Sequence, residues 1–139
     1  MNSNLILQPA MALALFTLTV LLLILMKRIR AAVNKQVKID DFKYGESDTV
    51  PVWVCLPNRN FMNLLEVPIL FYVVSIFIFI TQHVDMLFVY LAWAYVVLRI
   101  IHSAIHLGYN NVVHRALIFG LSNAVLVIMW LRIAFISYV

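Results

Sequence analysis

The stretch LILQPAMALALFTLTVLLLILM, residues 5–26, carries no charged side chain and decides the class of fold. At a rise of about 1.5 Å per residue, a helix of this length crosses the roughly 30 Å hydrocarbon core of a bilayer. Basic residues follow the run instead of preceding it, which is the reverse of a cleavable signal peptide. We therefore predict a retained transmembrane helix here.

The rest of the chain has the same apolar character. Of its 139 residues 65% are hydrophobic and 12% are charged, whereas a soluble domain has about 45–50% apolar and about 25% charged residues. Three further apolar runs predict spans at about 58–80, 86–107 and 113–137, and residues 27–57 form the one long polar loop. The sequence thus predicts a single all-α domain over residues 1–139, an integral membrane four-helix bundle.

The distribution of basic residues predicts the orientation of these spans. Six of them fall in the first loop: Lys27, Arg28, Arg30, Lys35, Lys38 and Lys43. The second connection, residues 81–85, has none, so the positive-inside rule places the first and third loops in the cytoplasm and both termini outside. Because the charges cluster in one loop, they indicate topology, and no nucleic-acid partner is expected.

Polar side chains recur along one face of each of the two middle spans. They are Arg59, Asn63 and Glu66 on the second span, and Tyr95, Arg99, His102 and His106 on the third. Steps of three and four residues keep each set on one helix face. Glu66 and Arg99 both lie about 12 Å inside the predicted cytoplasmic ends, so we expect them to pair. Ionisable groups inside a membrane are costly and by default indicate a functional site.

Simpler interpretations of these residues stay open. Glu66 and Arg99 would also be explained as a structural ion pair, because buried ion pairs are weak indicators of function. His102 and His106 have the i, i+4 spacing of a helical metal pair, but Arg99 would repel a cation, so no metal site is predicted.

Two arginines of the fourth span have a simple explanation of their own. Arg132 lies toward the external end, where snorkelling to the interface accounts for its charge. Arg115 lies at the cytoplasmic start of the span, where either snorkelling to the interface or a functional role would explain its charge.

The motifs resemble those of the MAPEG superfamily, the membrane-associated proteins in eicosanoid and glutathione metabolism. The second-span pattern Arg59-x3-Asn63-x2-Glu66, followed by a proline, is similar to the family signature. The string LAWAYVVLRIIHSAIH, residues 91–106, looks like the bacterial branch. Its Arg-x2-His element, with Arg115 sixteen residues after that arginine, is similar to the prostaglandin E synthase branch. Together with four spans and the chain length, the resemblance covers the whole chain.

This resemblance implies a homotrimer of four-helix bundles, with sites between the subunits near the cytoplasmic side that take glutathione as cosubstrate. Six residues would bind or frame the peptide: Arg59, Asn63, Glu66, Arg99, His102 and His106. Arg115 would be the catalytic arginine that holds the glutathione sulfur as thiolate. His106 stands where better-studied members carry a tyrosine.

The expected function is a membrane-bound glutathione- or thiol-dependent transferase or peroxidase in the bacterial inner membrane. Its expected partners are the lipid bilayer, further copies of the chain and lipophilic electrophiles. The family also contains non-catalytic members. A lipid- or anion-binding membrane protein or scaffold is therefore the alternative.

Overall fold

The computed structural model describes residues 3–138, and every element of regular secondary structure in that range is helical. The five α-helices are α1 (Leu7–Val33), α2 (Val52–Leu65), α3 (Pro68–Ile80), α4 (Met86–Leu107) and α5 (Val112–Tyr138). Two short 3-10 helices, η1 (Ser3–Ile6) and η2 (Ile39–Phe42), complete the described chain. Four stretches are long and apolar enough to cross a membrane: Ser3–Val33, Val52–Ile80, Met86–Leu107 and Val112–Ser137. The prediction of an all-helical chain with four such stretches is confirmed.

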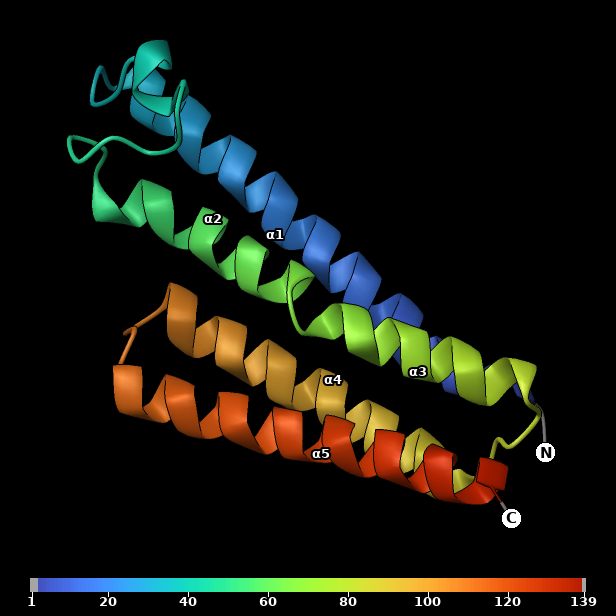
Figure 1. Cartoon of the computed structure of the whole chain (residues 1–139). Helices are drawn as coiled ribbons and strands as arrows, with labels where there is room; N and C mark the ends of the chain where they lie inside the picture. The colour runs from blue at the N-terminus through green and yellow to red at the C-terminus, as the bar shows by residue number, and fades with distance from the viewer. Residues whose placement is uncertain (1–2, 139) are drawn as a thin grey trace.

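The helices run up and down (Figure 1). Helix α1 packs along α2 and α3, and α4 lies antiparallel against α5 over most of its length. Both termini lie at one end of the bundle, and the connection 34–51 lies at the other together with the link between α4 and α5. We call this second end the basic end, because the six basic residues of positions 27–43 lie there.

One stripe of α1 faces the other helices. Ile6, just before α1, and Leu13 and Val20 within it recur every seven residues and are buried. They join a core with apolar residues of the other helices: Phe71, Val74, Ile78, Phe88, Ala92, Val96, Leu126, Met129 and Ile133. The opposite side of α1 exposes leucines, as a lipid-facing surface does. Because lipid tails are as apolar as these side chains, close van der Waals packing holds the helices together.

The second span differs from the prediction at its beginning and in its middle. Helix α2 begins at Val52, within the predicted loop of residues 27–57, and Pro57 lies buried inside this helix. Neighbouring helices make such a proline tolerable in a membrane helix. The span then breaks at Glu66, whose ψ of −97° is not helical, and Pro68 opens α3. At a first helical position the missing N–H of proline removes no hydrogen bond, so Pro68 fits the start of α3 after the break.

The first connection is shorter than the predicted loop of residues 27–57. Helix α1 continues to Val33, so only residues 34–51 connect it to α2. The chain reverses at Lys35, whose φ of 54° lies in the left-handed region. Arg28 on α1 donates to Glu46 at 3.4 Å and lies 4.5 Å from the centre of the Phe42 ring. These contacts fasten the connection to the end of α1.

At the opposite end of the bundle, Asp85 joins α4 to α5. Its side chain accepts the Phe88 N–H at 2.9 Å, which caps α4. Both carboxylate oxygens also accept from the Arg132 guanidinium, which lies 4.2 Å from the Phe88 ring centre. The Arg132 hydrogen bonds hold the pKa of Asp85 below its ordinary value. Arg132 therefore has a protein partner, which snorkelling alone did not predict.

Candidate functional site

Arg99 on α4 forms the centre of the polar face and is fully buried, with 0% of its surface exposed. Its Nε donates to the Tyr95 hydroxyl at 3.0 Å, on the same helix. One terminal nitrogen donates to Asn63 Oδ1 on α2 at 3.3 Å, and the other to Asn123 Oδ1 on α5 at 2.8 Å. The ring of Phe119 lies 4.9 Å from the guanidinium carbon. Neutral oxygens from three helices therefore hold this cation.

Glu66 is not among these partners, and the predicted pairing of Glu66 with Arg99 is wrong. No ion pair of Arg99 occurs in the described chain. Helix α2 brings Asn63 level with Arg99, so Glu66 lies about one turn further along, exposed at the end of α2. A buried cation with only neutral partners keeps its positive charge uncompensated, and such a charge favours an anion nearby.

A hollow of about 230 Å³ lies beside this network, lined by Asn63, His102, Val112, Arg115, Ala116 and Phe119. We call it the Arg115 hollow. It brings together three of the seven site residues predicted from the sequence, namely Asn63 from α2, His102 from α4 and Arg115 from α5. Asn63 both lines the hollow and accepts the hydrogen bond from Arg99, so it connects the buried charge to the hollow.

Arg115 is held at the start of α5 by the preceding turn. It is half-buried, and its guanidinium donates to Asn110 Oδ1 at 2.8 Å. Asn111 Oδ1 accepts the N–H groups of Val113 and His114 at 3.0 and 3.1 Å, which caps the helix. Residues 3–138 offer the guanidinium no further hydrogen bond, so its other N–H groups are left to bind a ligand.

The two histidines lie one turn apart on α4, and both are buried. The ring centre of His102 lies 5.8 Å from that of Phe119 and 6.0 Å from that of His106. The Nδ1 atom of each ring is buried without a hydrogen-bond partner in the described chain. Within the same residues, no group of three or more His, Cys, Asp or Glu side chains is placed to hold a metal ion.

Comparison with known families assigns the chain. The sequence model of the MAPEG family matches residues 6–135, which is nearly the whole chain. The chain belongs to the MAPEG family. Its members are membrane-associated proteins in eicosanoid and glutathione metabolism, and the four apolar helices fit that class. No match is found among curated proteins or among solved structures.

Four of the predicted residues of this MAPEG protein lie outside the Arg115 hollow. Arg99 lies behind the wall that Asn63 forms. Arg59 and Glu66 are exposed on α2 and at its end, respectively. His106 is buried one turn beyond His102 and does not line the hollow.

Sequence reasoning predicted Arg115 on α5 but missed two further residues of that helix. Phe119 covers Arg99 and lines the hollow, and Asn123 accepts the shortest hydrogen bond of Arg99. Arg115, Phe119 and Asn123 follow one another at steps of four residues, so they share a helix face, as the polar residues of α4 do at steps of three and four. The Asn123 amide lies in the middle of an apolar run, and this was the feature of the sequence that could have indicated its role in the site.

Proposed function

We propose that this MAPEG protein binds an anionic thiol, with glutathione as the expected one, and uses its sulfur against lipophilic electrophiles or peroxides. The observation that carries the proposal is the Arg115 hollow, which places Arg115 with Asn63 and His102 beside the uncompensated charge of Arg99. Glutathione has carboxylates at both ends, so a cationic site suits it on charge alone.

Arg115 is the residue that would activate the sulfur. A free thiol has a pKa of about 8.5, and a neighbouring guanidinium favours the thiolate, which is the nucleophile. In a transfer to 1-chloro-2,4-dinitrobenzene, a C–S bond forms and the C–Cl bond breaks. Chloride leaves with the electron pair, and the thiol proton passes to water. With a hydroperoxide, the thiolate breaks the O–O bond, and a second thiol completes the reaction to disulfide, alcohol and water.

The size of the hollow supports a site shared between subunits. At about 230 Å³ it is smaller than the roughly 300–1,000 Å³ of most small-molecule sites. Arg59 and Glu66 are exposed at the depth of the apolar helices, where a charge facing lipid is costly. A homotrimer in which a second subunit covers these side chains would enlarge the hollow and remove that cost. A soluble thiol would enter from the basic end, which the positive-inside rule places in the cytoplasm.

The test is turnover by purified protein with glutathione and either 1-chloro-2,4-dinitrobenzene or cumene hydroperoxide. We expect Arg115→Ala to lower kcat by about 10²–10³-fold, the loss usual for one donor to a reacting anion. Arg30→Gln is the matched control, because Arg30 is exposed on α1 outside the hollow. Full activity of Arg115→Ala would remove the assigned role.

Glutathione binding is measured separately by isothermal titration calorimetry. Binding that depends on Arg115 without turnover of any electrophile would favour the alternative function, a non-catalytic anion-binding membrane protein. Neither binding nor turnover would contradict both forms of the proposal.

A further inference from the structure

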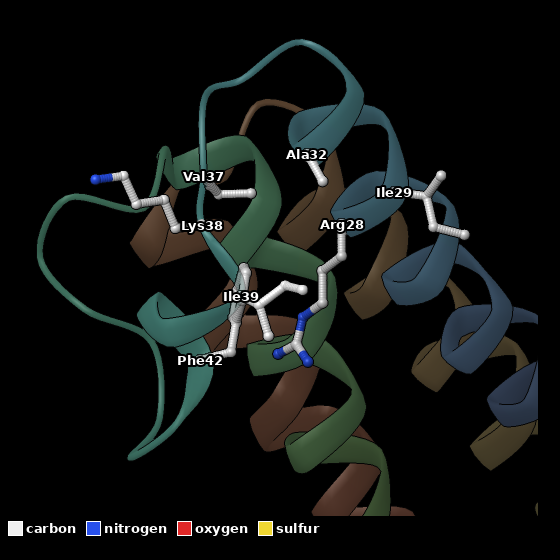
Figure 2. A pocket seen from close by; sticks show the side chains of 7 residues that line it. All are labelled: Arg28, Ile29, Ala32, Val37, Lys38, Ile39 and Phe42. Carbon is white, nitrogen blue, oxygen red and sulfur yellow. The ribbon is translucent and has the colours of Figure 1, made fainter.

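A second hollow lies at the basic end, where the connection 34–51 folds against the end of α1. Its volume is about 260 Å³, and it shares no residue with the Arg115 hollow. We call it the Arg28 hollow; Figure 2 shows its lining residues, Arg28, Ile29, Ala32, Val37, Lys38, Ile39 and Phe42. Five of these are apolar, and the surface that lines the hollow is almost entirely apolar, so Arg28 and Lys38 add their charges beside an apolar hollow.

The apolar part of the Arg28 hollow continues the lipid-facing surface of α1. Leu22, Leu25, Met26 and Ile29 follow one another at i, i+3, i+4 and i+7, and each is more than half exposed. Ile29 ends this stripe and lines the hollow. Ile39, on the other side of the hollow, is 91% exposed. An acyl chain that lies along the stripe therefore reaches the hollow without leaving apolar surface.

The Arg28 guanidinium provides a positive charge beside the apolar lining and lies next to Ile39 and Phe42 in Figure 2, whereas Lys38 points away from them. The only carboxylate bonded to Arg28 in the described chain is Glu46, at 3.4 Å. That is longer than the roughly 2.7–2.9 Å of a strong charge-assisted hydrogen bond. The other terminal nitrogen of Arg28 makes no hydrogen bond in the same residues and is not buried. The guanidinium therefore retains donors for a further anion.

The position of Arg28 along α1 matches the head groups of a bilayer. Arg28 follows the apolar run by two residues, or about 3 Å of helix. Residues 27–50 carry six basic and four acidic side chains, and one of the acids, Asp41, accepts the Lys38 backbone N–H at 2.7 Å. A juxtamembrane cluster of four to eight basic residues is a common binding site for anionic lipid.

We propose that the Arg28 hollow binds an anionic phospholipid of the adjoining leaflet. One acyl chain lies along the α1 stripe and ends in the hollow, and the phosphate is bonded by Arg28 with Lys38 at the rim. Continuity with the lipid-facing stripe favours a membrane lipid over a soluble anion. The lipid would fix the connection 34–51 to the membrane surface.

Native mass spectrometry and thermal unfolding of the full chain in detergent, with added phosphatidylglycerol or phosphatidylcholine, test this proposal. We expect phosphatidylglycerol to bind more tightly and to raise the melting temperature more. Arg28→Gln should weaken phosphatidylglycerol binding by about fivefold, the factor for one basic residue at an anionic surface. Lys43→Gln is the matched control, because Lys43 is an exposed cation of the same connection that does not line the hollow.

We expect Glu46→Gln to change the affinity for phosphatidylglycerol in the direction opposite to Arg28→Gln. It frees Arg28 from its carboxylate, so phosphatidylglycerol should bind more tightly, although the variant loses the same ion pair as Arg28→Gln. A merely structural role of the pair would make both variants lose lipid binding alike. Equal binding of the two lipids, equal losses in Arg28→Gln and Lys43→Gln, or full replacement of the lipid effect by inorganic phosphate would overturn the proposal.

Discussion

Asn123 is the residue on which the buried Arg99 charge depends most directly. Its Oδ1 accepts from Arg99 at 2.8 Å, shorter than the 3.0 and 3.3 Å bonds to Tyr95 and Asn63. Asn123→Ala leaves a charged donor unpaired inside the bundle. We expect the free energy of unfolding, measured in mixed micelles, to fall by about 1.5–3 kcal/mol.

The neighbouring Ser122 provides the control for this prediction. It is more deeply buried than Asn123, but its hydroxyl bonds to the Phe119 carbonyl of its own helix. Ser122→Ala is therefore expected to cost less than about 1 kcal/mol. Equal losses in Asn123→Ala and Ser122→Ala would show that burial, and not the bond to Arg99, decides the effect.

At the scale of residues, the sequence predicted which side chains share a helix face but not which atoms they contact. The steps of three and four residues placed Arg99, His102 and His106 together, as the buried face of α4 shows. Partners across helices depend on where each helix begins. Helix α2 begins at Val52, six residues before the predicted start, and the partner of Arg99 is accordingly Asn63 in place of Glu66.

At the scale of elements, the Asp85 contact between α4 and α5 predicts a pH dependence of stability. Arg132 lowers the pKa of Asp85 in the folded chain below its unfolded value of about 3.9. The stabilising contribution is therefore present above about pH 4 and is lost as the pH falls through the lowered value. Asp85→Asn keeps a good helix cap but removes the ion pair.

We expect Asp85→Asn to melt at a lower temperature than the wild type at pH 7 and to approach it as the pH falls below 4. Thermal unfolding followed by circular dichroism across this range measures the difference. Asp48→Asn, at an exposed position of the connection 34–51, serves as the control and should show no such convergence. A constant gap at every pH would mean that the ion pair does not titrate in this range.

The break between α2 and α3 is a feature of the elements that the sequence did not predict. Pro57 and Pro68 are the same residue type in one apolar region, yet Pro57 lies inside a helix and Pro68 begins one. Proline restricts only its own φ and the residue before it, so local sequence left both outcomes open. Packing against the neighbouring helices decides between them.

At the scale of the whole molecule, hydropathy alone was enough to predict four spans, because a bilayer permits few other solutions for such runs. The cost of polar groups facing lipid also applies to Glu66, because its side chain is exposed on the single chain at the depth of the apolar helices. In the proposed trimer another subunit covers this carboxylate with polar groups. Glu66→Leu should then weaken the assembly, which native mass spectrometry detects as loss of a species of three 16.0 kDa chains.

A lipid-facing position of Glu66 predicts the opposite result for Glu66→Leu. If Glu66 faced lipid, Glu66→Leu would remove a charge from hydrocarbon and stabilise the chain by about 3 kcal/mol, with the mass unchanged. Met62→Leu, an apolar exchange at another exposed position of α2, is the control and should alter neither quantity. A wild-type mass of one chain would contradict the trimer itself. A stabilised Glu66→Leu trimer would place Glu66 on the lipid face and require the Arg115 hollow to be completed by other residues.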